Sequence, residues 1–393
     1  MDSGLLILDA GSGSTKLGWS TDPNPQVVYP SVVGRPKLVG DDSYAGIDIK
    51  DIMVGNDAWK ARKFLDLKYP IENGIVKDWE DCQHLWTYGF NELKVKPSTS
   101  SVLITEPVRN PDENKEKVAE LIFEKFGFNS MQIQLQAILS MYAEGIDTAC
   151  VLDSGDGVSN VIPIVRGYVL NNQIKRSNLA GKEITKYLTK LLFLRGYAFN
   201  STADFETVKE IKEKLGFISH NIALDRKIAN ETVFYEQDYL LPDGTLVKLG
   251  KERFEASEIL FDPKMVEFST DGLGTMVFDA IRSGDATVRN QLYKSILLSG
   301  GTTMLPGFPD RLKADIVQSW KTFVRKNPTT DVKAPVEVIA PPRRHINVFS
   351  GATLFAKSVA KGKGAEAMIS KKEYEEQGKI IIKKKAWSNI SVA

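Results

Sequence analysis

The chain has 393 residues, and its 51 Lys and Arg residues against 50 Asp and Glu residues give a formal net charge of +1. A composition that is 42% apolar and 26% charged belongs to a globular chain able to bury a sizeable core, which excludes a disordered or fibrous protein. The near-zero charge argues against a nucleic-acid partner held by overall electrostatics. The length predicts two or three domains, or two lobes around a cleft.

The cysteines and histidines are few and far apart in the chain. They are Cys82, Cys150, His84, His220 and His345, a spacing that predicts buried free thiols and no zinc site. No apolar run approaches the roughly 18 residues of a membrane helix. The apolar run near the start is too short, and lacks the basic flank, for a signal peptide. We therefore expect a cytoplasmic protein without membrane insertion.

Two segments of the chain repeat each other, LDAGSGSTK at 8–16 and LDSGDGVSN at 152–160. Each follows a predicted apolar strand (5–8; 149–152) and precedes another (16–19; 161–165). The unit of strand, glycine turn and strand therefore occurs twice. This repetition predicts two lobes of one duplicated design. A related element, ILLSGGTT at 296–303, runs from an apolar strand into two glycines.

Helical patterns lie between these elements, at 115–126, 136–143 and 205–215. Strands that alternate with helices favour an α/β fold. Residues 41–52 read as a polar loop. Residues 357–385 hold nine Lys against four Glu, a pattern more typical of a solvated surface helix with a loose end than of a binding segment.

The two glycine turns indicate a site for polyphosphate. Glycine lets the backbone approach a ligand, and successive N–H groups in such turns form anion sites, to which Ser12, Ser14 and Lys16 would add donors. Asp9 and Asp153 would repel phosphate unless Mg²⁺, held mostly through water, lay between them. One such turn is more often an ordinary hairpin, but two matched copies favour a phosphate clamp. The motifs of P-loop NTPases, of dinucleotide-binding folds and of protein kinases are absent from the sequence.

The paired turns resemble those of the superfamily of actin, heat-shock protein 70 and sugar kinases. Four segments are similar to actin itself: YPSVVGRP at 29–36, KYPIENGIV at 68–76, DSGDGV at 153–158 and LSGGTTM at 298–304. The similarity extends from Leu6 to about Gly378. Other segments resemble one branch of the actin-related proteins: IDIKDIMVG at 47–55, RGYAFN at 195–200, ADFETV at 203–208, LPDG at 241–244, PPRR at 341–344 and an insertion around 319–333.

The resemblance implies an actin-like ATPase fold of two α/β lobes around a nucleotide cleft. Lobe one would hold residues 1–135 and 347–393, with a small subdomain at 32–69. Lobe two would hold residues 136–346, with a small subdomain at 180–268. The hinge would lie near 136–143 and 344–346.

The resemblance also implies the site residues. The phosphate-binding positions are Ser12, Gly13, Ser14, Lys16, Gly155, Asp156, Gly157 and Val158. Asp9 and Asp153 would orient hydrated Mg²⁺, and Gln136, with Asp153, would serve hydrolysis by positioning the attacking water. The ribose and adenine positions are Gly181, Lys209, Lys212, Glu213, Gly300, Gly301, Thr302, Met304, Leu305 and His345.

The sequence departs from the actin pattern at several of these positions. Asn160 replaces the histidine that helps to order the attacking water. Leu305 and His345 replace a tyrosine and a lysine beside the adenine, and Lys209 replaces an arginine. Asn73 stands where actin has its methylated histidine, and residues 37–46 lack the apolar tip of the actin loop. We therefore expect binding of ATP or ADP with at most slow hydrolysis.

The resemblance implies a cytoskeletal subunit of the complex that nucleates branched actin filaments. This subunit would act as a template for the pointed end of the daughter filament. Its partners would be actin-related protein 3, the other subunits, actin and nucleation-promoting activators. A groove between the lobes, with Tyr142, Leu354 and Phe355, would receive actin or an activator helix. The alternatives are a conventional filament-forming actin and, less favoured, a small-substrate kinase.

Overall fold

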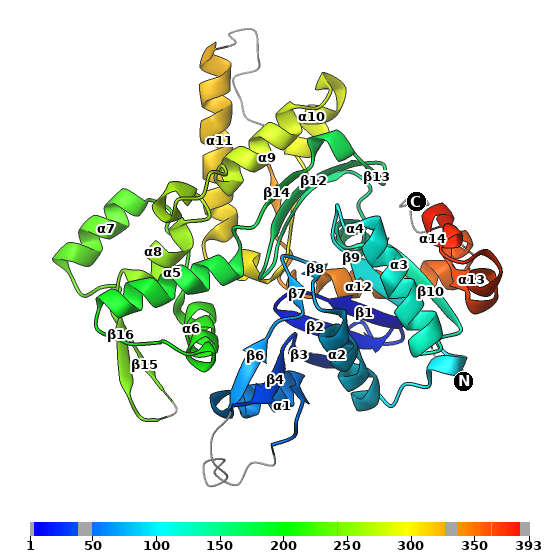
Figure 1. Cartoon of the computed structure of the whole chain (residues 1–393). Helices are drawn as coiled ribbons and strands as arrows, with labels where there is room; N and C mark the ends of the chain where they lie inside the picture. The colour runs from blue at the N-terminus through cyan, green and yellow to red at the C-terminus, as the bar shows by residue number, and fades with distance from the viewer. Residues whose placement is uncertain (1–3, 38–48, 242, 327–335, 363, 386–393) are drawn as a thin grey trace. The chain divides into compact units, whose positions relative to one another are not determined.

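The structure is a computed structural model that describes residues 4–37, 49–241, 243–326, 336–362 and 364–385 (Figure 1). It divides into two compact units. Unit 1 comprises Met1–Thr148, Ile164–Val169 and Arg343–Ala393, and unit 2 comprises Ala149–Pro163 and Leu170–Pro342. Most of the predicted loop at 41–52 and the end of the insertion at 319–333 lie outside the described residues.

Unit 1 is built on a six-stranded sheet in the order β19-β10-β9-β1-β2-β3. Its strands are β1 (Leu6–Ala10), β2 (Ser14–Trp19), β3 (Val27–Pro30), β9 (Ser101–Glu106), β10 (Ser130–Leu135) and β19 (Ile369–Ser370). β1, β9 and β10 run parallel, whereas β2 and β3 form an antiparallel meander beside β1. The carboxyl ends of three parallel strands therefore meet at one edge of the sheet.

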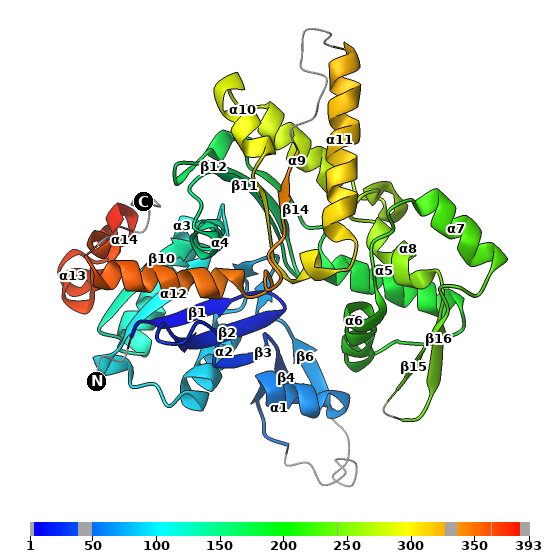
Figure 2. The ribbon, with the colours of Figure 1, turned by 180° about the vertical axis from the view of Figure 1, so that it is seen from behind.

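Apolar side chains alternate along these strands and form a core on each face. Leu6 and Leu8 face one cluster, which includes Trp86 of α2 (Trp79–Glu92) and Val118 of α3 (Asp112–Glu120). Ile7 faces the other cluster, with residues of α4 (Gln136–Glu144) and α12 (Asn347–Ala360). Figure 1 shows the face of the sheet that α2 and α3 cover, and Figure 2, seen from the opposite side, shows α12 on the other face. Successive side chains of a strand point to opposite faces of the sheet, so β1 contributes to the core under both layers of helices.

Unit 1 also contains a smaller sheet and several short elements. The small sheet has the order β5-β4-β6 and a core of its own. The elements are β4 (Val33–Pro36), β5 (Met53–Val54), α1 (Gly55–Lys60), η2 (Arg62–Phe64), β6 (Leu65–Lys68), β7 (Ile71–Glu72), β8 (Ile75–Val76), η3 (Pro97–Thr99), the π-turn η4 (Leu121–Lys125), η8 (Ala365–Ala367), α13 (Lys371–Gln377) and α14 (Ile380–Lys385). The predicted helix at 115–126 is confirmed as α3 followed by η4.

The division differs from the predicted lobes in three places, because residues 136–148, 164–169 and 343–346, all expected in lobe two, fall in unit 1. The second lobe was expected to begin at residue 136, but α4 lies in unit 1. The reason is its packing against α12, where a Cβ on Gly351 would lie only 1.7 Å from the carbonyl oxygen of Leu139. Two helices that approach so closely are held together as one body.

The lysine-rich segment is packed against unit 1, so the prediction of a loose end is wrong for its described part. Ile381 and Ile382 of α14 are buried in the core of unit 1. Lys379 and Lys383 lie within 3.9 Å and 3.4 Å of Glu116 on α3. Ile381 and Ile382, which precede the last lysines, give α14 an apolar face that the count of charges did not reveal.

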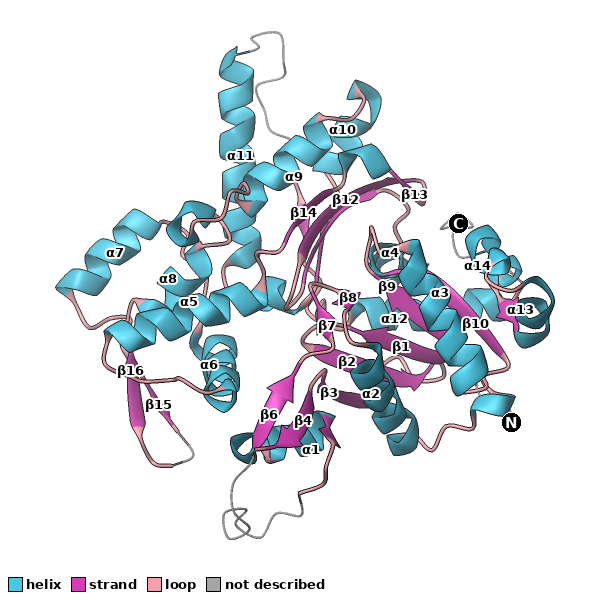
Figure 3. Ribbon diagram, in the orientation of Figure 1, coloured by secondary structure: helices cyan, strands magenta, loops and turns pink. Residues whose placement is uncertain are grey.

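Unit 2 contains a second sheet with the order β13-β12-β11-β17-β18 and β14 beside β12 (Figure 3). The strands are β11 (Ala149–Ser154), β12 (Ser159–Val165), β13 (Tyr168–Val169), β14 (Lys175–Ser177), β17 (Ile296–Ser299) and β18 (Val338–Ile339), of which Ile164–Val169 is grouped with unit 1. β11, β17 and β18 are parallel. This central run of parallel strands repeats the plan of unit 1.

Helices make up most of the rest of unit 2. They are η5 (Asn171–Gln173), α5 (Gly181–Leu194), α6 (Thr202–Leu215), α7 (Ile222–Glu231), α8 (Glu252–Glu258), η6 (Pro263–Val266), α9 (Leu273–Arg282), α10 (Ala286–Tyr293), η7 (Gly301–Met304) and α11 (Phe308–Lys326), with a hairpin of β15 (Gln237–Leu240) and β16 (Leu246–Leu249). α5 packs against α6 and α8, and α9 packs against α11. No helix among the described residues has the length and apolarity needed to cross a membrane.

Candidate nucleotide site

The first glycine turn (residues 9–16) joins β1 to β2 in unit 1. The Gly11 N–H donates to the carbonyl oxygen of Ser14 at 3.1 Å and closes the turn. Ser31 supports it, because its Oγ donates to the Gly11 carbonyl at 2.7 Å and its N–H to the Gly13 carbonyl at 3.3 Å. The turn is thus held in place from the end of β3.

Asp9 is the centre of a hydrogen-bond network at the carboxyl edge of the unit 1 sheet. It is 4% exposed, and its Oδ1 accepts from Thr105 Oγ1 at 2.6 Å and from Gln136 Nε2 at 3.3 Å. Its Oδ2 lies 3.3 Å from Lys16 Nζ. The three donors come from β9, α4 and β2, so the parallel register of β1, β9 and β10 brings them together. The predicted residues Asp9, Lys16 and Gln136 form one group.

The second glycine turn (residues 153–160) joins β11 to β12 in unit 2. The Gly155 N–H donates to the carbonyl oxygen of Val158 at 3.0 Å, which is the same bond at the same repeat position as in the first turn. Ser154 and Ser159 share a hydrogen bond of 2.8 Å between their hydroxyls. The sequence repeat is therefore confirmed as two hairpins of one design.

Two further elements meet the second glycine turn. At the start of α5, the Gly181 N–H donates to the Gly155 carbonyl at 3.1 Å and the Lys182 N–H to the Asp156 carbonyl at 2.7 Å. From η7, Thr302 Oγ1 donates to the Gly155 carbonyl at 2.7 Å. The amino end of a helix favours a nearby negative charge. The structure thus groups predicted ribose and adenine positions with predicted phosphate positions.

Gly300 and Gly301 differ in the space around them. Gly300 has a φ of +89°, and a Cβ there would lie 2.3 Å from the carbonyl oxygen of Ser154. A Cβ on Gly301 would have no atom within 4 Å. Only glycine fits the first position. The second position is open, and Met304 follows it at the end of η7.

Lys212 of α6 is buried rather than exposed. Its Nζ donates to the Gly181 carbonyl and to Thr185 Oγ1, both at 3.0 Å. Burial lowers the pKa of Lys212, although the charge of Asp156 opposes this. The structure thus encloses a lysine that the resemblance to actin places among the ribose and adenine positions.

Lys209, one turn earlier on α6, supplies positive charge to the second glycine turn. Burial alone would lower the pKa of Lys209, but Asp156, Glu206 and Glu213 outweigh it and raise the pKa. The Glu206 carboxylate lies 3.9 Å from Lys209 Nζ. Glu213 is exposed.

Asn160 occupies the position in the second turn that Lys16 occupies in the first. Its side chain is 1% exposed, and its Oδ1 has no hydrogen-bond partner among the described residues. A buried acceptor without a donor is costly unless a water or a ligand supplies one. Asn160 therefore fits a site that becomes complete when a donor enters.

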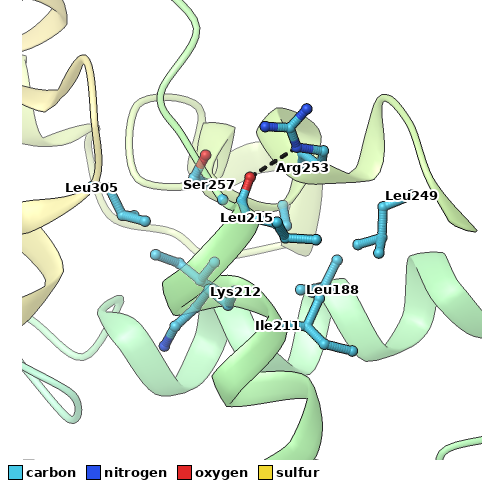
Figure 4. Close-up of a pocket in the computed structure, with 11 residues that line it drawn as sticks. Leu188, Ile211, Lys212, Leu215, Leu249, Arg253, Ser257 and Leu305 are labelled. Atoms are coloured by element: carbon cyan, nitrogen blue, oxygen red, sulfur yellow. Dashed lines mark hydrogen bonds between the residues drawn. The ribbon is translucent and has the colours of Figure 1, made fainter. Parts of the chain in front are cut away.

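A small apolar cavity lies beside Leu305 in unit 2 (Figure 4). Leu188, Ile211, Leu215 and Leu249 line it together with Leu305, and it has room for about one water. Leu305 is buried. The position that holds a tyrosine in actin thus contributes to an apolar wall in this chain.

Two other predictions concern unit 1. His345 is exposed, and its pKa is lowered by partial burial and by the positive charges of Lys16, Arg343 and Arg344. The prediction that Phe355 lines a surface groove is wrong, because Phe355 is 0% exposed and belongs to the core between α4 and α12.

The other two groove residues are accessible in unit 1. Leu354 is 44% exposed, and Tyr142 is half-buried with its ring 5.3 Å from that of Phe355. Leu354 and Phe355 are neighbours on α12 and point to different sides of the helix. The helical spacing of Phe349, Ala352 and Phe355 was a usable sequence signal for the core face.

Some residues of the site were not predicted from the sequence. Thr105 holds Asp9, and Gly74 donates its N–H to Ser12 Oγ at 2.8 Å. Thr105 ends an apolar strand, which was a usable signal, since carboxyl ends of parallel strands carry functional groups. Gly74 gave no such signal. Among the described residues, no group of three or more His, Cys, Asp or Glu side chains stands ready to bind a metal directly.

Comparison with known proteins gives the family. The model of the Actin family matches residues 2–387. The chain belongs to the actin family. It is 44% identical to actin-related protein 2 of Acanthamoeba castellanii over 384 residues, which cover 97% of this chain and 98% of that protein. It is 42% identical to actin-related protein 2 of Schizosaccharomyces pombe (96% and 97% covered) and of Drosophila melanogaster (97% of each).

These relatives confirm both parts of the resemblance. The segments similar to actin indicated the family, and those at 195–200 and 203–208 indicated the branch of actin-related protein 2. The α/β fold expected for an actin family member is also confirmed.

Proposed function

We propose that this chain is the ATP-binding actin-related subunit of the complex that nucleates branched actin filaments. It would act there as a template for the pointed end of the daughter filament. The observation that carries the proposal is the full-length similarity to proteins named actin-related protein 2. We place it in the cytoplasm, in the actin cytoskeleton, with actin-related protein 3, actin and nucleation-promoting activators as partners.

Both glycine turns have groups that suit nucleotide phosphates. In the first, the Ser12 and Ser14 hydroxyls, the Gly13 backbone and the Lys16 ammonium would hold them. In the second, the backbone of Gly155, Asp156, Gly157 and Val158 would do so. The open space beside Gly301 supports a ligand at this turn. The buried acceptor of Asn160 suits a water that donates to it, since phosphate oxygens only accept. Gly181, Lys209, Lys212, Glu213, Gly300, Thr302, Met304, Leu305 and His345 are the proposed ribose and adenine positions.

Asp9 and Asp153 would hold Mg²⁺ through its waters. Three donors already engage the Asp9 carboxylate, so its remaining lone pairs suit the water shell of a hydrated cation better than direct ligation. Mg²⁺ would neutralise phosphate charge when bound. Gln136 would orient a water through its amide, whereas Asn160 cannot take up a proton near neutral pH as a histidine can. We expect ATP to act mainly as a conformational ligand.

The proposed hinge lies near 136–143 and 344–346, where the chain approaches the boundaries of the two units at 148–149 and 342–343. Contacts that ATP makes in one arrangement of the lobes and not in another would shift the population between them.

Purification from native cells tests the proposal. We expect an affinity-tagged chain to be recovered in equal amounts with actin-related protein 3 and the other subunits of a branching complex. Recovery as a filament of the chain alone would instead indicate a conventional actin, and turnover of a small phosphate acceptor would indicate a kinase.

A surface variant tests the template role in the reconstituted complex. Leu354→Asp places a charge on the exposed side of α12, where an apolar side chain is available for protein contact. We expect complex assembly and ATP affinity to be unchanged and branch formation, counted by filament microscopy, to be lost. Ile380→Asp is the matched control, because Ile380 is 62% exposed elsewhere in unit 1. Normal branching by Leu354→Asp would contradict the assignment.

A further inference from the structure

The tight turn between β7 and β8 contains the only Asn-Gly pair of the sequence, Asn73 and Gly74. Asn73 has a φ of +50° and Gly74 a φ of +76°. Positive φ at both central residues defines a type I′ turn, for which Asn-Gly is the preferred pair. The hairpin is short, since each strand has two residues.

The nitrogen of Gly74 is held by a side chain from the first glycine turn. The Gly74 N–H donates to Ser12 Oγ at 2.8 Å, across 62 positions of the chain. Gly74 has no side chain to shield this nitrogen. The Asn73 side chain is only half-buried, so water reaches the turn. The hydrogen bond to Ser12 therefore restrains the Gly74 backbone nitrogen, which directly follows Asn73 in the chain.

We propose that Asn73 is a site of spontaneous deamidation whose rate Ser12 restrains. The Gly74 nitrogen loses its proton and attacks Cγ of Asn73, forming a C–N bond, and the carboxamide nitrogen leaves as ammonia. Water then opens the five-membered imide at either carbonyl and gives aspartate or isoaspartate. The net change is addition of water and loss of ammonia, with no oxidant or reductant. A Gly74 N–H that donates to Ser12 is less able to reach and attack Cγ.

The modification would change the turn in two ways. It adds a negative charge beside the loop that contains Ser12. The isoaspartate product also inserts a methylene into the backbone, which moves the Gly74 N–H away from Ser12 Oγ. If the first glycine turn binds phosphate, a consequence that rests on the proposed function, then Asn73→Asp should lower ATP affinity by charge repulsion.

Peptide mapping by mass spectrometry of the purified full-length chain tests the proposal. After incubation at physiological temperature, we expect aspartate and isoaspartate to accumulate at residue 73. Ser12→Ala should raise that rate about two- to tenfold, the effect of losing one hydrogen bond. Ser12→Thr keeps the hydroxyl and should retain the wild-type rate.

The pair Asn200 and Ser201 serves as an internal control. The Ser201 N–H donates to the Asp204 carboxylate at 2.9 Å, so no Ser12 variant touches it. Its rate should be the same in every variant. Equal rates at residue 73 in wild type and Ser12→Ala, or a parallel rise at residue 200 that reports general unfolding, would overturn the proposal. Deamidation at residues 73 and 200 is measured from peptide masses and does not depend on nucleotide binding. A failure of ATP binding would therefore count only against the proposed function.

Discussion

In the first glycine turn the residue at the end of the repeat is Lys16, whose ammonium lies 3.3 Å from Asp9. In the second turn that position holds Asn160, a neutral side chain with an unsatisfied buried acceptor. Positive charge reaches the second turn from α6 instead, where Asp156 raises the pKa of Lys209 against the effect of burial. The first turn thus contains its own cation, and the second depends on a helix about 50 residues further along the chain.

The difference shows what a duplicated fold retains and what it changes. The closing hydrogen bond, from Gly11 to Ser14 and from Gly155 to Val158, uses only backbone atoms and is the same in both copies. Side chains around it are free to diverge as long as buried charges find partners. Conservation of the backbone and exchange of charges are separate properties, and variants can test each of them.

The largest effect is expected for Gly300→Ala, which tests the backbone of the second turn. The new Cβ would lie 2.3 Å from the Ser154 carbonyl oxygen at a φ of +89°. We expect a loss of stability of about 3–5 kcal/mol from strain and overpacking, measured by denaturant unfolding. Gly301→Ala is the matched control, with no atom within 4 Å of its Cβ, and should change stability by less than about 0.5 kcal/mol. Equal losses in both would show that the close contact does not matter.

The next effect concerns the two aspartates. Asp9→Ala and Asp153→Ala should each weaken Mg-ATP binding about 10–100-fold, the usual effect of losing a group that holds a metal's water shell. Titration calorimetry measures the affinity. Asp9→Ala also leaves Lys16 Nζ without its carboxylate, so the double variant with Lys16→Met should lose less than the sum of the two single losses. Additive losses would contradict local charge compensation. Wild-type affinity in both single variants would refute the proposal that both turns bind Mg-ATP.

A third effect concerns a buried carboxyl group at the carboxyl edge of the unit 1 sheet. Glu106 follows Thr105 at the edge of unit 1, and burial raises its pKa to about 7, despite the hydrogen bond from Asn110 and the charge of Lys115. The folded state then binds the proton more tightly than the unfolded state, so stability falls as the pH rises from about 4.5 through 7. Glu106→Gln should reduce this fall by about 3 kcal/mol, measured by unfolding at a series of pH values. The exposed Glu113→Gln is the control, and an unchanged slope in Glu106→Gln would exclude this carboxyl as its source.

The sequence predicted the parts of the site that local patterns determine. Both glycine turns follow from a nine-residue segment that occurs twice in the chain, at 8–16 and 152–160. The helix at 205–215 follows from its apolar spacing. Thr105 could not be placed beside Asp9, because their contact depends on the register between β1 and β9, which lie about 90 residues apart. Phe355 was misplaced for a different reason. Val348, Ala352 and Phe355 recur at helical spacing on the buried face of α12, so the pattern that places Phe355 in the core was available in the sequence.

The smallest effect is expected at Asn160, where the two turns differ most in chemistry. A histidine there could accept a proton above its pKa of about 6.5, and it would place an imidazole where the structure has an amide. We expect Asn160→His to increase single-turnover phosphate release from the assembled complex by no more than about tenfold, since ordering one water is worth about one hydrogen bond. Asn160→Leu, which can neither donate nor accept, should release phosphate no faster than the wild type. The opposite result is a wild type that releases phosphate faster than the histidine variant at equal thermal stability. It would mean that the buried Oδ1 of Asn160 already orients the water at least as well as an imidazole does. The second turn would then have a catalytic role without a proton acceptor at this position.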